Sequence, residues 1–197
     1  MFTGIIETLG TVKAKTVEGT NIHFDISSPI THELKIDQSV AHNGVCLTVV
    51  AIEGDTYRVT AIEETLQKTN LKSWEAGKKV NIERCMPANG RFDGHIVQGH
   101  VDQIGKVVTI EERDGSWLFD FSFDPAMGNV TVEKGSITIN GTSLTCFNSK
   151  NGGFTVAIIP YTNEFTNFHQ LQVGDEVNLE FDIVGKYIQR IIRGYQH

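Results

Sequence analysis

Short runs in which apolar and polar residues alternate with a period of two dominate the chain. These runs cover 21–26, 45–50, 57–62, 79–83 and 116–123. Because successive side chains of a strand point to opposite faces, the runs predict half-buried β-strands. Turn signals separate them, and Asn-Gly pairs at 43–44 and 140–141 lie between apolar runs, which is a strong hairpin signal.

The same order of runs and turns occurs twice. Residues 39–83 align without a gap onto 136–180 at an offset of 97, and Gly4 aligns with Gly99 at an offset of 95. A repeat of this length indicates tandem domains rather than a solenoid. We therefore predict an all-β protein of two tandem six-stranded antiparallel Greek-key barrels related by the internal repeat, plus a C-terminal helix. The predicted ranges are 1–87, 88–184 and, for the helix, 185–197.

Helical signals are few. One short helix per half is predicted at 64–71 and at 162–168, each with a Thr near its start that could cap it. Near the C-terminus the period changes, and the apolar residues Ile188, Ile191, Ile192 and Tyr195 fall on one helical face. A helix this short is marginal alone, so this face predicts self-association.

Composition excludes several classes of protein. A net charge of −7 gives no basic surface for nucleic acid. No stretch approaches the ~20 apolar residues of a membrane helix, and the first residues lack the basic region of a signal peptide. The three cysteines, Cys46, Cys85 and Cys146, are odd in number and widely spaced, so neither a disulfide framework nor a zinc site is expected. We predict a cytoplasmic protein with no membrane or nucleic-acid partner.

The repeat places candidate chemical groups at equivalent positions. Residues i and i+2 of a strand share a face, so Cys46 and Thr48 point the same way, as do their repeat images Ser143 and Thr145. One thiol and one hydroxyl are thus expected at matching places in two pockets. The alternative is that Cys46 and Ser143 are small residues that fill tight barrel positions.

Two histidines lie in the most polar strand-like stretch, 95–102. His95 and His100 are five residues apart, which puts them on opposite faces of a strand, so they cannot ligate one metal. His95 is interpreted as a strand residue satisfied by hydrogen bonds. His100 replaces Ile5 of the other half and suits a general base. A phosphate-binding loop is absent from the sequence, so dinucleotide binding has no support.

Several separate motifs together resemble one family. They are MFTGIIE at 1–7, SVAHNGVCLTV at 39–49, FDGHIVQGHVD at 92–102, KGS at 134–136 and NGTSLT at 140–145. In this order they closely resemble riboflavin synthase of the alpha-chain type, along the whole chain.

The resemblance implies a transferase of riboflavin biosynthesis. Two molecules of 6,7-dimethyl-8-ribityllumazine would react by four-carbon transfer to give riboflavin and 5-amino-6-ribitylamino-uracil. It also implies that no metal or organic cofactor is needed. The assembly would be a homotrimer joined by C-terminal helices, with each active site between the N-terminal barrel of one subunit and the C-terminal barrel of its neighbour.

The resemblance also implies a set of ligand contacts. In the first barrel these are Gly4, Ile5, Ile6, Ser39, Cys46, Leu47, Thr48, Thr60, Ala61, Ile62, Glu63, Glu64 and Thr65. In the second they are Gly99, His100, Val101, Lys134, Ser143, Leu144, Thr145, Ile159, Pro160, Tyr161, Thr162, Asn163, Glu164 and Asp182. Asn140 and Tyr161 depart from the family pattern, and both are expected beside the second pocket.

Four residues are the catalytic candidates. His100 leads as the acid/base, Ser143 and Thr145 would orient the ligand or relay protons, and Cys46 would position the partner molecule or add to it transiently. Dismutation needs one donor and one acceptor, and the unlike pairs Cys46/Ser143, Ile5/His100 and Glu64/Tyr161 are where that choice could be made. The sequence leaves open which barrel holds the donor.

Two other classes of protein remain as alternatives. One is a non-catalytic lumazine- or flavin-binding protein, such as the light-emitting antenna relatives of this fold, which lose polar pocket residues in one barrel. The other is a structural tandem-barrel module that binds no ligand. Retention of polar residues in both halves favours the enzyme.

Overall fold

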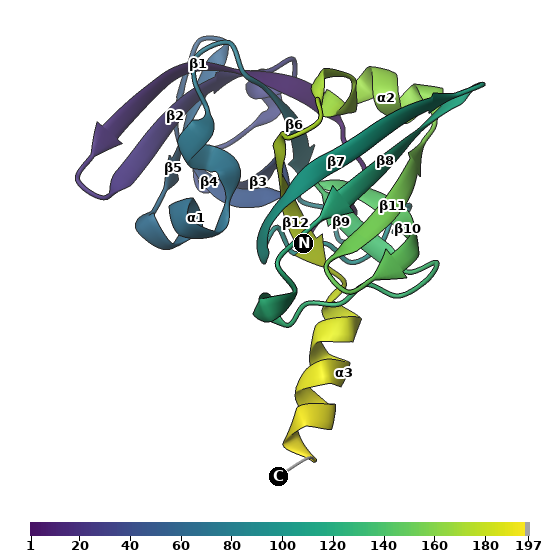
Figure 1. The fold of residues 1–197 in the computed structure, drawn as a ribbon. Helices are drawn as coiled ribbons and strands as arrows, with labels where there is room; N and C mark the ends of the chain where they lie inside the picture. The colour runs from purple at the N-terminus through teal and green to yellow at the C-terminus, as the bar shows by residue number, and fades with distance from the viewer. Residues whose placement is uncertain (196–197) are drawn as a thin grey trace.

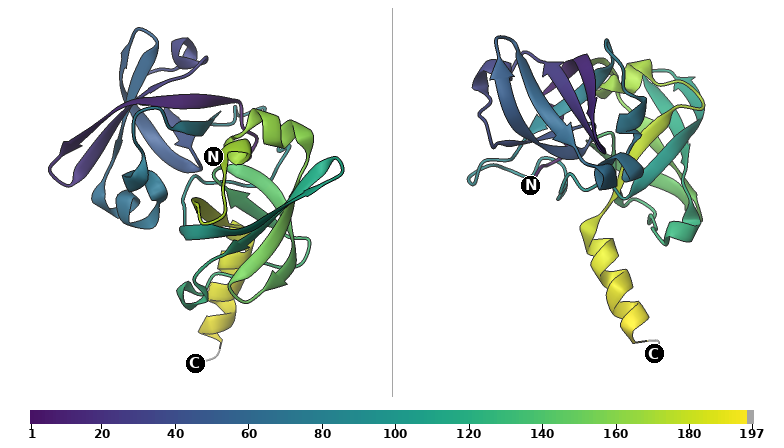
Figure 2. Two further views of the ribbon diagram at one scale, coloured as in Figure 1. Left: turned by 45° about the horizontal axis from the view of Figure 1, so that its top comes forward. Right: turned by 90° about the vertical axis from the view of Figure 1, so that its left-hand side faces the viewer.

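The computed structural model describes residues 1–195, which form two β-barrels and a C-terminal helix that projects away from them (Figures 1 and 2). The first barrel consists of β1 (Thr8–Glu18), β2 (Asn21–Ser27), β3 (Ser39–His42), β4 (Val45–Glu53), β5 (Thr56–Ala61) and β6 (Lys79–Arg84). The second consists of β7 (Gln103–Arg113), β8 (Ser116–Ser122), β9 (Ser136–Ile139), β10 (Thr142–Lys150), β11 (Gly153–Ile158) and β12 (Glu176–Phe181).

Both barrels are closed, antiparallel and equivalent in topology. In the first, the strands follow the order β1-β2-β5-β4-β3-β6, and the last strand pairs again with β1. The second repeats this order with β7-β8-β11-β10-β9-β12. Because β2 pairs with β5 rather than with β3, each barrel is a Greek key. The predicted fold class is confirmed.

The two barrels have different cores. Trp74 and Phe24 lie against each other in the first, with ring centroids 5.4 Å apart, among aliphatic residues. The second contains six buried phenylalanines, and Phe119 meets Phe168 edge to face at 5.2 Å. The repeat therefore preserves the backbone while the side chains that fill it have diverged.

The predicted helices at 64–71 and 162–168 are each interrupted. The first is α1 (Glu63–Lys68) followed by the 3₁₀ turn η2 (Asn70–Ser73), and the second is α2 (Pro160–Phe165) followed by η4 (Asn167–Gln170). The predicted threonine caps of these helices are wrong, because the N-cap positions are Ile62 and Ile159 and make no side-chain bond. Instead, the extended residues Thr69 and Thr166 end α1 and α2 and cap the 3₁₀ turns. Two further 3₁₀ turns are η1 (Thr31–Glu33) and η3 (Pro125–Met127).

Buried asparagines join the barrels about an approximate two-fold axis. The Asn81 side-chain amide donates to the Asn140 carbonyl at 2.8 Å, and its repeat image Asn178 donates to the Asn43 carbonyl at 3.0 Å. Asn81 also accepts from the Asn167 backbone N–H at 2.8 Å. Asn140 therefore lies at the interface between the barrels and not beside the second pocket, which corrects the sequence-based expectation.

The C-terminal helix α3 (Ile183–Gly194) starts just after β12. Asp182 accepts from the Val184 N–H at its N-terminus, and Lys186 forms a 2.7 Å ion pair with Asp102. The apolar residues of the predicted face, Ile188, Ile191, Ile192 and Tyr195, are all more than half exposed. The last two residues of the predicted range 185–197 lie outside the described residues. Among residues 1–195, none of the helices is long and apolar enough to span a membrane.

Candidate functional site

Two segments that precede the first strand of each barrel run side by side. We call residues 1–6 the first strap and residues 93–101 the second strap. They are antiparallel and are bridged at Phe2 and Val97, whose backbone groups exchange hydrogen bonds of 2.7 and 3.1 Å. Val97 is the only second-strap residue in the described structure that makes such a bridge, so 95–102 is not the strand that the sequence predicted.

Each strap docks on the barrel of the other half. Ser143 N–H donates to the Gly4 carbonyl at 2.8 Å, and Cys46 N–H donates to the Gly99 carbonyl at 2.9 Å. Both glycines have positive φ, and a Cβ at either would lie 2.6 Å from the Cβ of the serine or cysteine. Within one chain, Gly4 therefore contacts β10 of the second barrel and Gly99 contacts β4 of the first, the reverse of the barrels to which the resemblance assigns them as ligand contacts.

A buried carboxylate holds each strap in place. Glu83 on β6 accepts from the N–H and hydroxyl of Thr3 and from the Gly4 N–H, at 2.7 to 3.2 Å. Its repeat image Glu180 on β12 accepts from the backbone N–H groups of residues 98–100, at 2.7 to 3.0 Å. Burial raises the pKa of both carboxyls, against the effect of these hydrogen bonds. The sequence analysis missed both residues, although their identity in the two halves was a visible signal.

The exchange creates a cavity of about 220 Å³ beside Cys46, the Cys46 pocket. It is lined by Val45, Cys46, Glu64, Thr65, Lys68, Thr69, Gly99, His100 and Val101. Burial raises the pKa of the Cys46 thiol, while a hydrogen bond with Ser39 opposes the shift. The thiol is therefore neutral at pH 7, and His100 is the titratable strap residue at this pocket.

A second cavity of about 500 Å³ lies beside Ser143, the Ser143 pocket. It is lined by Ile5, Asp93, Gly94, Lys134, Ser136, Ser143, Leu144, Thr145, Phe147, Ala157, Ile159 and Thr162. The Lys134 ammonium lies 5.1 Å from the centre of the Phe147 ring. Ile5 and His100, which are repeat images, therefore end up at opposite pockets, and His100 and Ser143 do not share a cavity within one chain.

His95 contacts the Ser143 hydroxyl directly. Its Nδ1 lies 2.7 Å from Ser143 Oγ, and its Nε2 lies 3.1 Å from Thr138 Oγ1. The imidazole is half-buried, and this burial lowers its pKa while the charge of Asp182 raises it. The sequence interpretation of His95 as a hydrogen-bonded residue was correct, but its partner on β10 was not foreseen.

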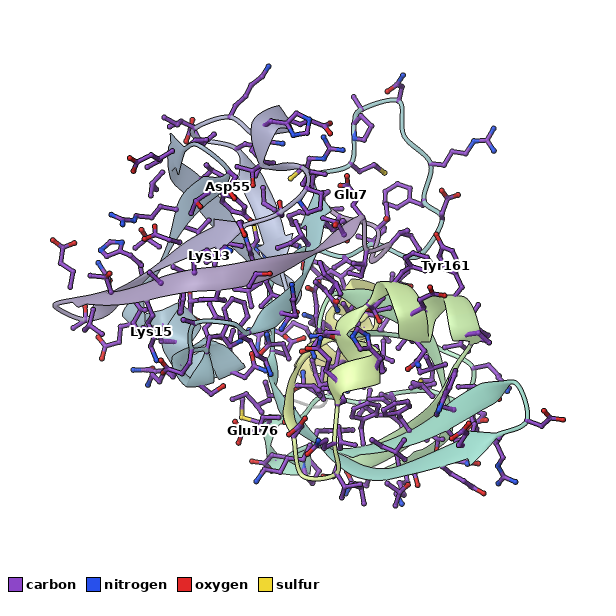
Figure 3. The ribbon with its side chains drawn as sticks, turned by 90° about the horizontal axis from the view of Figure 1, so that it is seen from above. Glu7, Lys13, Lys15, Asp55, Tyr161 and Glu176 are labelled. Carbon is purple, nitrogen blue, oxygen red and sulfur yellow. The ribbon has the colours of Figure 1, made fainter. Side chains whose placement is uncertain are left out.

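The remaining predicted contact residues line neither cavity. They are Gly4, Ile6, Ser39, Leu47, Thr48, Thr60, Ala61, Ile62, Glu63, Pro160, Tyr161, Asn163, Glu164 and Asp182. The Leu47 side chain belongs to the barrel core, whereas Tyr161 is exposed on α2 (Figure 3). The Tyr161 ring lies 4.6 Å from the Phe165 ring, between centroids, and is tilted relative to it by 36°. Within residues 1–195, His, Cys, Asp and Glu side chains form no group of three that could hold a metal ion.

Comparison with known proteins agrees with the repeat. The lumazine binding domain model matches residues 3–85 and again 98–182. The chain thus consists of two lumazine-binding domains in tandem. It is 40% identical to riboflavin synthase of Bacillus subtilis over 98% of this chain and 90% of that one. Identity to riboflavin synthase of Mycobacterium tuberculosis is 37%, over 98% of both chains. The chain belongs to the riboflavin synthase family.

Solved structures of LumP share the fold. The complex of LumP with riboflavin has a TM-score of 0.84 and 25% sequence identity, over 92% of this chain and 99% of that one. The complex with 6,7-dimethyl-8-(1'-D-ribityl) lumazine has a TM-score of 0.83 at 23% identity, over 91% and 98% of the two chains.

Proposed function

We propose that the chain is a riboflavin synthase, a transferase that dismutates two molecules of 6,7-dimethyl-8-ribityllumazine. Four carbons would pass from one molecule to the other, giving riboflavin and 5-amino-6-ribitylamino-uracil. The observation that carries this proposal is the pair of related pockets in one chain, each next to its own matched lumazine-binding domain. A reaction between two copies of one substrate requires two such sites. Well-oriented partners can gain about 7–11 kcal/mol from proximity alone, without a cofactor.

The two pockets would take different roles because their side chains differ. At the Cys46 pocket, His100 would be the acid/base and the neutral Cys46 thiol would position the ligand. At the Ser143 pocket, Ser143 and Thr145 would orient the second molecule, and Lys134 would add positive charge. The other residues of the predicted contact set would complete both sites once ligands are bound.

The active site would be shared between subunits of a homotrimer. A cavity of about 220 Å³ is smaller than the roughly 300–1,000 Å³ of typical ligand sites, which favours a Cys46 pocket completed by a neighbour's second barrel. The exposed face of α3 supports assembly, because a helix of 12 residues needs a packing partner. A cytoplasmic location stays a prediction from the sequence.

Incubation of the purified chain with the lumazine tests the activity. Chromatography should show one riboflavin formed for every two lumazines consumed. Cys46→Ser should reduce turnover, whereas Cys85→Ser, a substitution at another half-exposed cysteine that lines neither pocket, should leave it near wild type. Lumazine that binds but is recovered unchanged would refute the enzyme.

That negative result would instead support a non-catalytic lumazine- or flavin-binding protein, which is the second candidate. The likeness to LumP, solved with a lumazine and with riboflavin, is the observation that favours it. Bound, fluorescent lumazine without riboflavin formation identifies this class. Failure to bind any pteridine would leave only a structural tandem-barrel module.

Assembly is tested with a substitution in α3. Ile191→Lys places a charge on the apolar face and should convert trimers into monomers in analytical ultracentrifugation, with loss of turnover. Arg190→Gln, on the opposite side of the helix, is the matched control and should leave the trimer intact. A wild-type chain that sediments as a monomer at all concentrations would refute the proposed assembly.

A further inference from the structure

We propose that Lys186 is a positioning residue for the Cys46 pocket, because it anchors the end of the second strap to helix α3. Asp102 directly follows the strap, and its carboxylate accepts from the Lys186 ammonium at 2.8 Å. The Lys186 and Asp102 side chains are only 24% and 20% exposed, so their charges are weakly screened by salt. This anchor lies two residues from His100, the titratable residue that the strap brings to the pocket.

Asp102 fixes the end of the strap to β12 as well as to α3. Its backbone N–H donates to the Leu179 carbonyl at 2.9 Å, and its carboxylate accepts from the Phe181 N–H at 2.8 Å. The Lys186 ammonium is the cationic partner of the same carboxylate. One aspartate therefore joins three segments, namely the strap, the last strand of the second barrel and the helix that follows this strand.

The charge of Lys186 also acts on Glu180, the carboxylate that holds the strap. Burial raises the pKa of the Glu180 carboxyl, and the charge of Asp102 raises it further, whereas the charge of Lys186 lowers it. Lys186 therefore offsets the repulsion between two neighbouring carboxylates and favours the ionised form of Glu180. An ionised carboxylate accepts hydrogen bonds through both oxygens, and Glu180 uses both for the backbone N–H groups of residues 98–100.

The repeat shows that the first strap has a different anchor. Glu7 takes the place of Asp102, and Arg84 takes the place of Phe181. The Glu7 carboxylate accepts from the Arg84 backbone N–H at 2.7 Å, and the cation beside it is the Arg84 side chain itself, with Nη2 at 2.6 Å. The first strap is therefore anchored from β6 of its own half, whereas the second is anchored from the C-terminal helix.

Helix α3 holds the strap with a different face from the one that is free for assembly. At 3.6 residues per turn, Lys186 lies on the side of α3 opposite to Ile188, Ile191 and Ile192. These three apolar side chains are more than half exposed. The helix can therefore hold the strap and pack against another subunit at the same time. The role of Lys186 in turnover rests on the proposed function, whereas the anchor itself does not.

Hydrogen–deuterium exchange of the full chain tests the anchor without turnover. Lys186→Gln should speed the exchange of the amides of residues 98–100 by about tenfold or more, because the carboxylate that protects them has lost its cation. The amides of Thr3 and Gly4, which Glu83 holds in the first strap, are the internal control and should not change. Lys186→Arg keeps the charge and should exchange like wild type. Wild-type exchange in Lys186→Gln, or an equal increase in both straps, overturns the anchor.

A double variant tests whether the ion pair is the cause. In an Asp102→Asn background, Lys186→Gln should change the exchange of residues 98–100 by less than about threefold, because its partner charge is already absent. A further increase of about tenfold in that background would show that Lys186 acts without Asp102, and it would overturn the pairing.

Riboflavin formation tests the positioning role. Lys186→Gln should lower kcat/KM by about 10–100-fold, because small displacements of catalytic groups have effects of this size, and Lys186→Arg should restore it to within about threefold of wild type. Arg190→Gln, which removes an exposed charge from the same helix, is the matched control and should keep the wild-type kcat/KM. Sedimentation of Lys186→Gln should match that of wild type.

Two results would overturn the positioning role and leave the proposed function standing. One is full activity of Lys186→Gln despite faster exchange of the strap. The other is dissociation of the Lys186→Gln assembly, which would place the effect in assembly rather than in the strap. A wild type that makes no riboflavin overturns the proposed function and with it the role in turnover, and the exchange result then decides the anchor alone.

Discussion

Gly99→Ala provides a direct test of the strap exchange. The added Cβ would lie 2.6 Å from Cys46 Cβ and 2.9 Å from the Phe2 ring. Carbon atoms prefer a separation of about 3.5–4.0 Å, so the second strap must retreat from β4 by roughly 1 Å. That displacement breaks the 2.9 Å hydrogen bond between Cys46 N–H and the Gly99 carbonyl. It also moves the adjacent His100 away from the pocket.

The magnitude follows from three contributions. A non-glycine residue at φ +79° is strained by about 1–2 kcal/mol. Loss of the hydrogen bond removes about 0.5–1.5 kcal/mol, and repacking around the new methyl group costs about 1–3 kcal/mol. We expect the free energy of unfolding to fall by about 2.5–6.5 kcal/mol. Gly54→Ala is the matched control, because Gly54 also has positive φ but a Cβ added there would meet nothing within 4 Å. Gly54→Ala should therefore lower the free energy of unfolding only by the backbone strain, about 1–2 kcal/mol.

Urea unfolding followed by tryptophan fluorescence gives the free energies of unfolding of both variants. Riboflavin formation by the folded protein gives the effect of each substitution on activity. Gly99→Ala should lose at least about 1.5 kcal/mol more than Gly54→Ala and should lose most of its turnover, whereas Gly54→Ala should keep its turnover. Equal stability losses and equal activities in the two variants would refute the docking of the second strap on the first barrel.

Three further predictions concern stability. Burial lowers the pKa of His42 from 6.5 to about 4. The neutral imidazole therefore contributes about 3 kcal/mol to the free energy of unfolding above pH 6.5, and this contribution is lost as the pH falls toward 4. Urea titrations should show this loss in wild type, and an equal loss in His42→Phe would contradict it. Glu180→Gln should destabilise by about 2–4 kcal/mol in the same assay, whereas the exposed Glu112→Gln should stay within about 0.5 kcal/mol. Asn81→Ala should cost about 2–4 kcal/mol by leaving buried partners unpaired, and a cost no larger than that of the exposed Asn151→Ala would show that the interface does not depend on it.

Period-two patterning and the repeat were sufficient to predict the barrels. Closure in particular could be anticipated, because six short strands per half would otherwise leave a sheet edge exposed. The helices were predicted less well, since a period of 3.6 does not reveal the extended residues Thr69 and Thr166 that interrupt them.

The exchange of the straps could not be predicted from the repeat. Alignment of Gly4 with Gly99 identifies equivalent residues, but it does not say whether each contacts its own barrel or the other one. His95 was assigned to a strand face by period-two reasoning, and the second strap is not a strand. His95 and His100 do lie at different pockets, but docking of the strap on both barrels separates them, not strand alternation.

The comparison of the two halves separates scaffold from chemistry. Glu83 and Glu180 are identical and hold the two straps in equivalent ways. The identical asparagines Asn81 and Asn178 join the two barrels in equivalent ways. At the pockets, by contrast, Ala41 has Thr138 as its image, and Cys46 has Ser143. These differences change the polar side-chain groups of each pocket, whereas the backbone contacts of the two halves remain equivalent. The duplicated barrels therefore present equivalent backbone frames while only one of the two pockets lies beside the Ser143–His95 pair, and the proposed dismutation, which needs one donor and one acceptor, requires an inequality of this kind.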